Sequence, residues 1–596
     1  ALRHSLGAKR AVDGTLIFGT PIVAFALQAA LVRDFEYAAA FSSLALGALY
    51  LALGWWMARP GEGKGEVHRW LAECFAALGL GFVTLAVPLA LDSRWTSAVW
   101  AVEGAAVFWL GRRQGRWLAR AAGLALQGLA AIAFLEAHRR GNVSPWPFAN
   151  PAFIGGTLLA ASAFGIAWWS REPAEGTGTR LDRAFANIES GFSPLLFWLG
   201  FFWWQFALYS EIDRMTLDVQ GVANHVFDEA GRLHLKLIAW VASAYIFHHL
   251  ALPERKNPWP IAATPVYTVL PVMVASALVG VATLNHVFQS GGWAAWPLVL
   301  MLHILMLKRL DAGPPQPWWT AVHTAGVWLM VLLAGNLLVF AVGQAKLWQT
   351  AWASVILLVS GIAVLLVLSR RRWFELAREG GPWPLERFGR AYLWFAAAPL
   401  AVAVALGCLV VAVFSNGNAK PLPYVPLLNP TDLAIGLGLA ACALWLMRIR
   451  ESDMAVPPGA RDTRWQLALA AIGFVAINTV WLRVVHHYGG IAWSGRQLFE
   501  SFLVQAGFSI LWTLIALGLM IGSHRRALRG AWMLGAGLLG LTVLKLFVID
   551  LSNRGGSERI FVFIAVGILM LVVGYFAPLP PANRAKLDES LQGAQS

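Results

Sequence analysis

The sequence predicts an all-α membrane protein, a bundle of about eighteen transmembrane helices with both termini in the cytoplasm. Two observations lead to this fold class. Apolar stretches of roughly 20 residues, the length at which a helix crosses a bilayer, recur along almost the whole chain. Lys and Arg gather in every second gap between these stretches. Because Lys and Arg mark the cytoplasmic loops of polytopic proteins, this alternation sets the topology and its orientation.

The composition indicates a membrane solvent rather than a large water-facing core. Of 596 residues, 58% are hydrophobic and 13% are charged, whereas soluble domains carry about 25% charged residues. The mean hydropathy is +0.61. The net charge of +14 would suit nucleic acid, but the clustered basic residues lie mainly in the expected cytoplasmic turns, so the positive-inside pattern explains them. We expect membrane lipids, and no nucleic acid, as partners.

The expected helices follow the apolar stretches in chain order. The first group occupies 15–32, 36–57, 68–91, 93–111, 117–138, 151–169, 191–209, 234–253, 260–282 and 293–308. The second occupies 317–340, 350–369, 391–414, 431–449, 464–485, 498–522, 530–551 and 558–578. Helices are expected because lipid requires each segment to satisfy its own backbone hydrogen bonds, and the alternating polarity of a barrel strand is absent. Connections of a few residues place consecutive helices antiparallel.

The basic gaps follow the even-numbered stretches. They contain Arg59 and Lys64; Arg112, Arg113 and Arg116; Arg171, Arg180 and Arg183; Arg255 and Lys256; Lys308 and Arg309; Arg370, Arg371 and Arg372; Arg448 and Arg450; and Arg525, Arg526 and Arg529. Most odd gaps are acidic, mixed or nearly uncharged. We therefore expect residues 1–578 to form one multi-pass transmembrane domain and residues 579–596 to form a polar cytoplasmic tail.

The start of the chain and its Trp and Cys residues agree with this interpretation. The sequence begins at Ala1 without Met or a signal peptide, so we expect an N-terminal part of the natural protein to be missing. Trp pairs such as Trp55-Trp56 lie at segment ends, as in an aromatic belt, although some of the 31 Trp could stack on a sugar or an isoprenoid. The three Cys lie in apolar stretches and predict neither a disulfide nor a metal site.

The longest outer loops are expected at Ser210–Leu233 and Ser415–Pro430. The first contains several Asp and Glu residues, but they lack the regular oxygen-ligand spacing of a calcium loop. We therefore expect a solvated loop there. The second is rich in Pro and Asn.

Two segments of the sequence are weakly similar to each other. A segment that enters with Trp95-Thr96 and leaves at Arg112-Arg113 resembles one that enters with Trp348-Gln349-Thr350 and leaves at Arg370–Arg372. Internal duplication is common in transporters. Convergence from the aromatic belt and the positive-inside bias would give the same pattern, and both explanations stay open.

Ionisable residues at membrane depth are the leading candidates for function, because they are costly there and usually face a cavity or a partner. Glu103 lies about 15 Å along its predicted helix, close to the membrane midplane. It shares a helix face with Trp100, and Arg94 lies near the outer end of the same segment. Lys545 is its natural partner, although Lys545 could also snorkel outward or meet Glu500. Glu103 could bind substrate or relay a proton, or it could form a structural ion pair with Lys545.

A second set of polar residues is expected at the outer ends of the late helices, where together with Arg94 it could line an outward-facing cleft. The set comprises Arg483, His486, His487, Arg496, Glu500 and Asp550. Adjacent helical positions point about 100° apart, so the two His side chains are poorly placed to bind one metal ion, and no metal is expected. Other polar residues within the segments (His303, His323, Asn336 and Asn478) predict hydrogen bonds between helices.

No familiar catalytic or phosphate-binding motif occurs in the chain. There is no His-Glu-Xaa-Xaa-His, no Gly-Xaa-Ser-Xaa-Gly and no phosphate loop. This counts against a familiar hydrolase or an ATP-driven pump, and no cofactor is expected. A membrane-embedded transferase with scattered acidic residues is not excluded.

Three stretches resemble a known family. Asp13–Pro21, the run from Arg94 through Trp100 to Ala105, and Leu544–Leu551 are similar to segments of bacterial multi-pass inner-membrane proteins catalogued as domain of unknown function 2339. The resemblance covers nearly the whole chain. It implies a bacterial inner-membrane location and a helical fold, and it implies no activity, catalytic residue or cofactor.

Three classes of function follow from these observations. The first is transport, in which the protein moves or holds a lipid-linked, sugar-like or other small envelope solute and Glu103 couples the cycle to protons. The second is a membrane-embedded enzyme or assembly factor for envelope lipids or glycans, with Glu500, Asp550 or a loop carboxylate as base. The third is a structural scaffold. A midplane charge without a catalytic motif favours transport.

Overall fold

The computed structural model describes residues 10–59, 66–90, 93–139, 148–172, 180–189, 191–216, 228–252, 257–314, 317–378, 381–526, 528–546, 548, 560, 564, 567–568 and 571. These residues are mainly helical, and no strand occurs among them. The chain divides into two compact units, Ala1–Ala312 and Gly313–Ser596. Each unit is described by itself.

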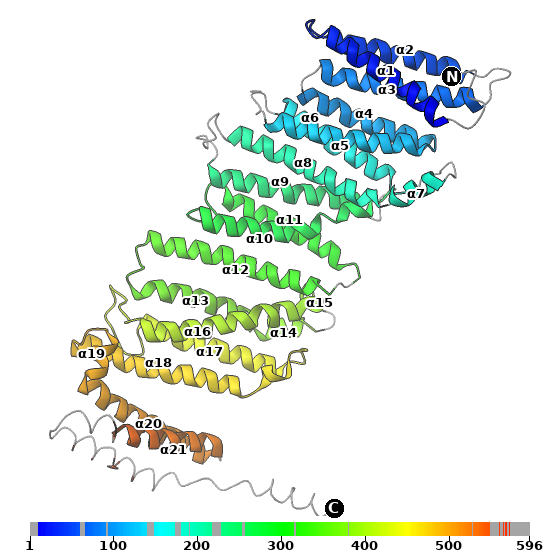
Figure 1. Ribbon diagram of the computed structural model, residues 1–596. Helices are drawn as coiled ribbons and strands as arrows, with labels where there is room; N and C mark the ends of the chain where they lie inside the picture. Colours follow the sequence, from blue (N-terminus) through cyan, green and yellow to red (C-terminus); the bar gives the residue numbers. More distant parts are fainter. Residues whose placement is uncertain are drawn as a thin grey trace, which may run out of the picture. The chain divides into compact units, whose positions relative to one another are not determined.

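The first unit is built from long helices joined by short connections (Figure 1). In chain order they are α1 (Arg10–Leu31), α2 (Ala38–Ala58), α3 (Glu66–Ala90), α4 (Ser93–Arg113), α5 (Trp117–Arg139), α6 (Pro151–Trp169), α7 (Arg180–Glu189), α8 (Phe192–Thr216), α9 (Glu229–Leu250), the 3₁₀ helix η1 (Pro260–Ala263), α10 (Val266–Thr283) and α11 (Gly292–Asp311).

The second unit is also built mainly from long helices, and it contains more short or irregular helices than the first. They are α12 (Trp319–Gln344), α13 (Ala351–Leu368), α14 (Arg371–Leu376), α15 (Leu385–Arg390), the π-helical η2 (Ala391–Ala396), α16 (Ala397–Phe414), α17 (Pro430–Glu451), the 3₁₀ helix η3 (Pro458–Arg461), α18 (Arg464–Gly489), α19 (Gly495–Glu500), α20 (Phe502–Arg525) and α21 (Arg529–Lys545).

The helical membrane fold predicted from the sequence is confirmed. Every expected segment from 15–32 through 530–551 coincides with a long helix, and the last, 558–578, lies almost entirely outside the described residues. Within the described part of the chain, twelve helices are long and apolar enough to cross a membrane, or thirteen if the bent pair Arg183–Glu189 and Phe192–Thr216 is one span. The total of about eighteen spans, the cytoplasmic termini and the polar tail from residue 579 stay predictions.

The expectation of a solvated loop at 210–233 is wrong at both ends of that range. Helix α8 continues to Thr216, and α9 already begins at Glu229. The Glu211 side chain is only 3% exposed. A buried carboxylate needs hydrogen-bond donors, and Arg214, Asn150 and the backbone N–H of Phe148 supply them. These partners come from segments far apart in sequence, which is why the local pattern did not reveal them.

Small residues allow the helices of the first unit to pack closely. Helix α4 packs against α5, and α2 packs against α3. A Cβ atom added to Gly104 would lie 2.8 Å from the carbonyl oxygen of Gly123, and one added to Gly123 would lie 2.6 Å from that of Gly104. The α4 and α5 backbones are therefore in direct contact at this pair, as in small-residue interfaces of membrane helices.

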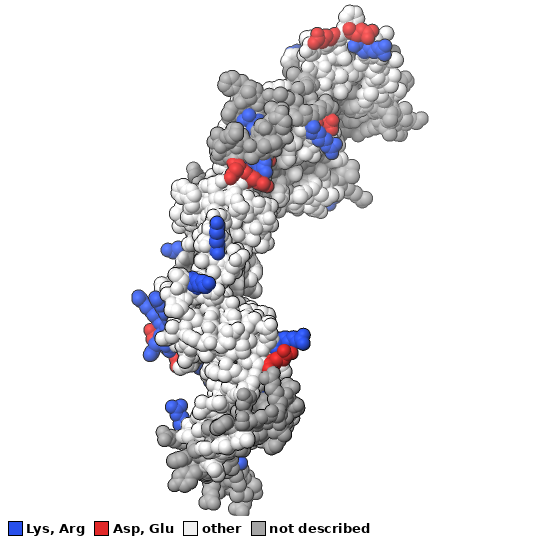
Figure 2. All heavy atoms as spheres, turned by 90° about the vertical axis from the view of Figure 1, so that its left-hand side faces the viewer, with Lys and Arg blue, Asp and Glu red and all other residues white. Residues whose placement is uncertain are grey.

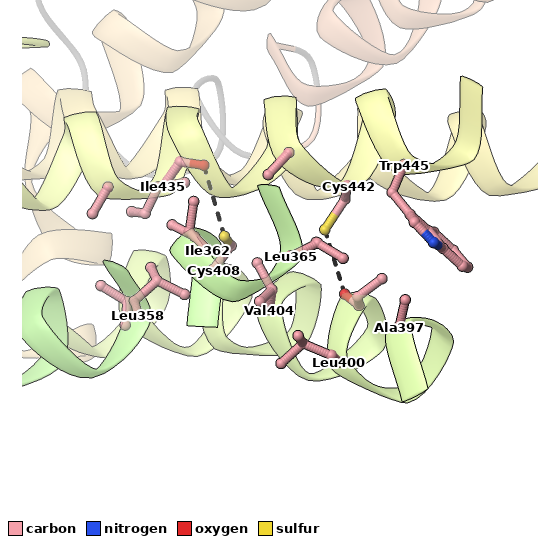
Figure 3. Packing of buried hydrophobic residues seen from close by; sticks show 14 of the residues in the cluster. Leu358, Ile362, Leu365, Ala397, Leu400, Val404, Cys408, Ile435, Cys442 and Trp445 are labelled. Atoms are coloured by element: carbon pink, nitrogen blue, oxygen red, sulfur yellow. Dashed lines mark hydrogen bonds between the residues drawn. The ribbon is translucent and has the colours of Figure 1, made fainter. Parts of the chain in front are cut away.

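The largest apolar core of the second unit lies among α13, α16 and α17. Leu358, Ile362 and Leu365 of α13 pack with residues of the other two helices (Figure 3). Cys408 and Cys442 belong to this core, and their thiols donate to the carbonyl oxygens of Ile435 and Ala401. The three Cys of the chain are free and buried, as small hydrophobic residues.

The outer surface of the helices is apolar. Large hydrophobic side chains such as Leu118, Ile132 and Val402 are more than half exposed. Figure 2 shows one face on which Lys, Arg, Asp and Glu are few and scattered among other residues. A soluble protein buries such side chains, whereas lipid solvates them, so the surface agrees with the membrane fold.

Candidate functional site

Glu103 lies near the middle of the 21-residue helix α4 and is bound by a residue of α3. The Thr84 hydroxyl donates a short hydrogen bond to Glu103 Oε1. Trp100, one turn earlier on α4, donates from its indole nitrogen to the Thr84 carbonyl oxygen over 3.1 Å. Trp100 and Glu103 therefore hold the same residue of α3, on the shared face that the helical spacing predicted.

The partner of Glu103 carries no charge. Among the described side chains no Lys or Arg forms an ion pair with Glu103, and its hydrogen bond comes from the neutral Thr84 hydroxyl. Arg94 belongs to α4, but its side chain lies outside the described residues. A carboxyl in an apolar surrounding with a neutral partner is costly to ionise unless a proton or another cation accompanies it.

The opposite side of α4 fixes the position of Glu103. Ala101 and Phe108 are fully buried, and Gln127 of α5 donates to the Ala101 carbonyl oxygen. Gly104, next to Glu103, lies against Gly123 of α5. Because α4 is packed tightly on α5, it cannot rotate to withdraw the carboxyl from α3 without breaking this interface.

Lys545 is buried at the end of α21, in the second unit. Its ammonium donates to the Gln505 carbonyl oxygen and to the Ser509 hydroxyl of α20, each at 2.8 Å. Lys545 is thus bound to polar groups of its neighbouring helix. The pairing of Lys545 with Glu103 stays a prediction.

The strongest polar network of the second unit surrounds Arg483 on α18. The Arg483 side chain is fully buried, and its Nη1 lies 2.6 Å from Oδ1 of Asp432, whose side chain is 3% exposed. Its Nε donates to the Ser415 carbonyl oxygen at 3.0 Å, and Nη2 donates to that of Ala412 at 2.8 Å. One guanidinium therefore joins α18 to the start of α17 and to the end of α16.

The segment 415–429 is held over this ion pair. Tyr424 donates to Asp432 Oδ2, and its ring stacks on His487 with centroids 4.4 Å apart. His487 contacts the Asn416 carbonyl oxygen at 2.9 Å, and Trp352 donates to that of Lys420. Burial and the charge of Asp432 raise the pKa of Tyr424 above its ordinary range. The Pro- and Asn-rich loop is thus an ordered cap on α16–α18.

The remaining members of the predicted outer cleft are placed separately. His486 contacts the Ile491 carbonyl oxygen at 2.7 Å. Arg496 and Glu500 form an exposed ion pair on α19, with Nε and Oε1 3.0 Å apart. Asp550 lies outside the described residues. The structure thus brings Arg483 and His487 into one network, while a cleft that also contains the other residues stays a prediction.

Sequence reasoning missed the carboxylates that complete the buried ion pairs. Asp432 follows Asn429-Pro430 at the start of an apolar stretch, a helix-start pattern that could have marked it. Glu189 of α7 pairs with the fully buried Arg120 of α5, with 3.0 Å between Arg120 Nε and Glu189 Oε2. No sequence signal joins those two, because they are 69 positions apart.

Two further expectations can be compared with the described residues. Among them, no group of three or more His, Cys, Asp or Glu could hold a metal ion. Asn478 accepts a hydrogen bond from Trp512 of α20, and His323 contacts the Tyr392 hydroxyl of η2, each between helices. The expected interhelical role of these two residues is confirmed.

Comparisons with known proteins give one match. No curated protein and no solved structure matches the chain. A family described as "Predicted membrane protein (DUF2339)" matches residues 1–580. The match spans both units and agrees with the helical, lipid-solvated fold. The chain therefore belongs to this family of predicted membrane proteins, DUF2339.

Proposed function

We propose that this multi-pass membrane protein lies in the bacterial inner membrane and transports or holds a lipid-linked, sugar-like or other small envelope solute. Glu103 is the proposed coupling residue. The observation that carries the proposal is its mid-helix position with the neutral Thr84 hydroxyl as partner. A structural carboxylate in lipid normally has a cation beside it, as Asp432 has Arg483.

The proposed chemistry is a proton cycle at Glu103. The charged carboxylate attracts a proton or a cationic or hydroxyl-rich group of the solute, and the neutral carboxyl crosses between two conformations at lower cost. Thr84 and Trp100 keep the carboxyl directed toward α3 in this cycle. No step requires a metal ion or a cofactor.

The test uses purified protein in vesicles of bacterial lipid. Two fluorescent probes, a headgroup-labelled phosphatidylglycerol and a labelled short polyprenyl phosphate sugar, report movement between leaflets, because dithionite bleaches only the outer leaflet. Wild-type protein is expected to accelerate the second bleaching phase of a probe that it transports, and an imposed pH gradient is expected to change the rate. Glu103→Gln is expected to reduce the rate of probe movement between leaflets to the rate in protein-free vesicles.

Matched measurements separate transport from its alternatives. Glu500→Gln removes an exposed carboxyl and is expected to leave the rate unchanged. If Glu500→Gln instead abolishes a covalent change in the probe seen by mass spectrometry, the enzyme alternative is correct. A probe that copurifies but does not move favours holding. Rates equal to protein-free vesicles with no bound probe contradict the proposal and favour a scaffold.

A further inference from the structure

One sequence pattern occurs once in each unit with the same spacing. Pro147, Asn150 and Pro151 precede and begin α6, and Pro426, Asn429 and Pro430 precede and begin α17. Twenty positions after the second Pro, an Arg-Glu pair begins in each case, just beyond the end of α6 and at the end of α17. These pairs are Arg171-Glu172 and Arg450-Glu451.

The backbone repeats with the pattern. Phe148 and Leu427, which occupy the same place in the two Pro-Xaa-Xaa-Asn-Pro turns, both adopt the left-handed conformation, with φ of 58° and 64°. Few residues other than glycine do so. The following Asn caps the helix in each case, accepting from Phe153 N in α6 and from Thr431 N in α17.

A buried carboxylate holds each turn through this left-handed residue. The Phe148 N–H donates to Glu211 Oε1 at 2.8 Å, and the Leu427 N–H donates to Asp432 Oδ2 at 3.3 Å. Each carboxylate also binds an arginine of the following long helix: Arg214 of α8 and Arg483 of α18. The carboxylates differ in origin, because Glu211 lies on α8 whereas Asp432 lies on α17.

The surrounding helices pack in the same order. In the first unit α4 contacts α5 and α6, α5 also contacts α6, and α6 contacts α8. In the second unit α13 contacts α16 and α17, α16 also contacts α17, and α17 contacts α18; α16 contacts α18 in addition. The two similar sequence segments coincide with α4 and α13: the Trp-Thr entry and the Arg cluster lie within α4 and flank α13. Aromatic belts and positive-inside bias explain neither the turn nor this packing order.

We infer that the chain contains two parallel repeats, α4–α8 and α13–α18, each fastened at its outer end by an equivalent latch. The latch is the turn at residues 148–151 or 427–430 with its carboxylate and arginine. Both turns precede an even-numbered apolar stretch, and both Arg-Glu pairs follow one, so the charge alternation places both latches outside. The latch holds the outer ends of α6 and α8, and of α17 and α18, together. This inference does not depend on the transport proposal.

The first test determines on which side of the membrane each turn lies. In full-length protein whose native Cys residues are replaced by Ala, Phe148→Cys and Leu427→Cys place single thiols on the exposed left-handed residues. A membrane-impermeant maleimide added to intact spheroplasts is expected to label both, and the same reagent added outside inverted vesicles, where it reaches only the cytoplasmic face, is the control. Labelling of the two positions from opposite sides overturns the parallel repeat.

The second test releases one latch at a time. Glu211→Gln is expected to raise the labelling rate at 148 about tenfold, the change that follows from losing one charge-assisted hydrogen bond. Asp432→Asn is expected to do the same at 427, and neither change should affect the other turn. Asn150→Ser keeps a helix cap but removes the amide that donates to Glu211, so it tests the first latch in a variant expected to fold. The Asn429 amide donates to the Gly417 carbonyl oxygen instead, so Asn429→Ser is expected to leave the Asp432 contact in place.

The controls make both results decisive. Glu500→Gln removes an exposed outer carboxyl and is expected to change neither labelling rate. Membrane abundance and the gel-filtration profile of each variant show whether it has folded. If only one of the folded Glu211→Gln and Asp432→Asn proteins is labelled faster than its parent at its own turn, the two turns are not equivalent latches and the inference is wrong.

Discussion

Two interior charges, Glu103 in the first unit and Arg483 in the second, are held in opposite ways. In the first unit, Glu103 sits mid-helix and receives a hydrogen bond from the neutral hydroxyl of Thr84. In the second, Arg483 is fully buried but is matched by Asp432 and by backbone carbonyl oxygens. The helix that our repeat inference pairs with α4 in the second unit, α13, carries no Asp or Glu. The charge of Arg483 is compensated by Asp432, whereas the described partner of Glu103 is a neutral hydroxyl.

The difference shows how to separate structural from functional charges in a membrane protein. Arg483 forms bonds that join three helices and the segment 415–429, so its removal should affect folding. The surroundings of Glu103 hold it in place through α5, and within the described part of the chain its hydrogen-bond partner is a neutral hydroxyl. A group of this kind contributes little to folding and is available for a proton or a ligand. The following changes test this distinction, beginning with the largest expected effect.

Removing Arg483 should be the most damaging change. Arg483→Gln leaves Asp432 buried without its cation, and we expect a loss of about 3–5 kcal/mol in the free energy of unfolding, the range for a broken buried ion pair. Reversible unfolding of the purified protein in mixed micelles measures it. The double variant Arg483→Met, Asp432→Leu should recover most of the loss, and Arg496→Gln, at an exposed pair, is the control. An Arg483→Gln protein as stable as the Arg496→Gln protein contradicts the structural role.

Two Gly→Ala substitutions should differ in whether a second substitution restores the stability of the protein. Gly123→Ala places a methyl group against the backbone of α4, and we expect a loss of about 1–3 kcal/mol. Gly438→Ala in α17 meets the Cys408 thiol instead, so Cys408→Ala should restore stability in the second unit. Gly128→Ala, which faces open space, is the control for α5. The same unfolding measurement gives the stability of each variant. If truncating one side chain of α4 restores the stability of Gly123→Ala as fully as Cys408→Ala restores that of Gly438→Ala, α4 and α5 are not in backbone contact.

Glu103→Gln should change stability little while abolishing activity. The amide still accepts the hydrogen bond from Thr84, so we expect a change below about 1 kcal/mol. The measurement is unfolding of the same preparation that is used in the leaflet assay. A large loss of stability, restored in the double variant Glu103→Gln, Lys545→Met, would instead identify a structural pair.

The pH dependence of Tyr424 should give the smallest effect. Burial raises its pKa in the folded protein, so the contribution of Tyr424 to stability is complete below the unfolded value of about 10 and is lost as pH rises above it. Wild-type protein should therefore lose more stability than Tyr424→Phe between about pH 9.5 and pH 11.5. Thermal unfolding across this range measures the difference, with Tyr37→Phe, at an exposed position of the first unit, as the control. If the stability of wild type and that of Tyr424→Phe fall equally with pH, the predicted contribution of Tyr424 is wrong.

Local patterns were sufficient for the helices but not for the pairs between them. Apolar length located the long helices, because lipid leaves a spanning segment no other way to satisfy its backbone. Helical spacing also placed Trp100 and Glu103 on one face. It did not identify Thr84 as their partner, nor Asp432 as the partner of Arg483. Sequence spacing says which side chains share a helix face, whereas their partners depend on which helix packs there.

The loops show the same limit. The range 210–233 looked like a solvated loop because it is acidic, yet Glu211 is buried where Phe148 and Asn150 supply donors. The segment 415–429 looked irregular because it is rich in Pro and Asn, yet Arg483 and His487 bind its carbonyl oxygens. In both cases a side chain whose charge suggests an exposed position in the sequence forms hydrogen bonds with a turn from another part of the chain.

The helical, multi-pass membrane fold, the positions of the long helices and the charged residues within them could be predicted without the structure. Hydrophobic length and charge alternation are local properties, and the bilayer acts on each segment separately. Only the tertiary structure decided which charges are compensated and that one turn and its carboxylate occur in both units. Those features depend on contacts between residues tens of positions apart, which form only when the helices pack.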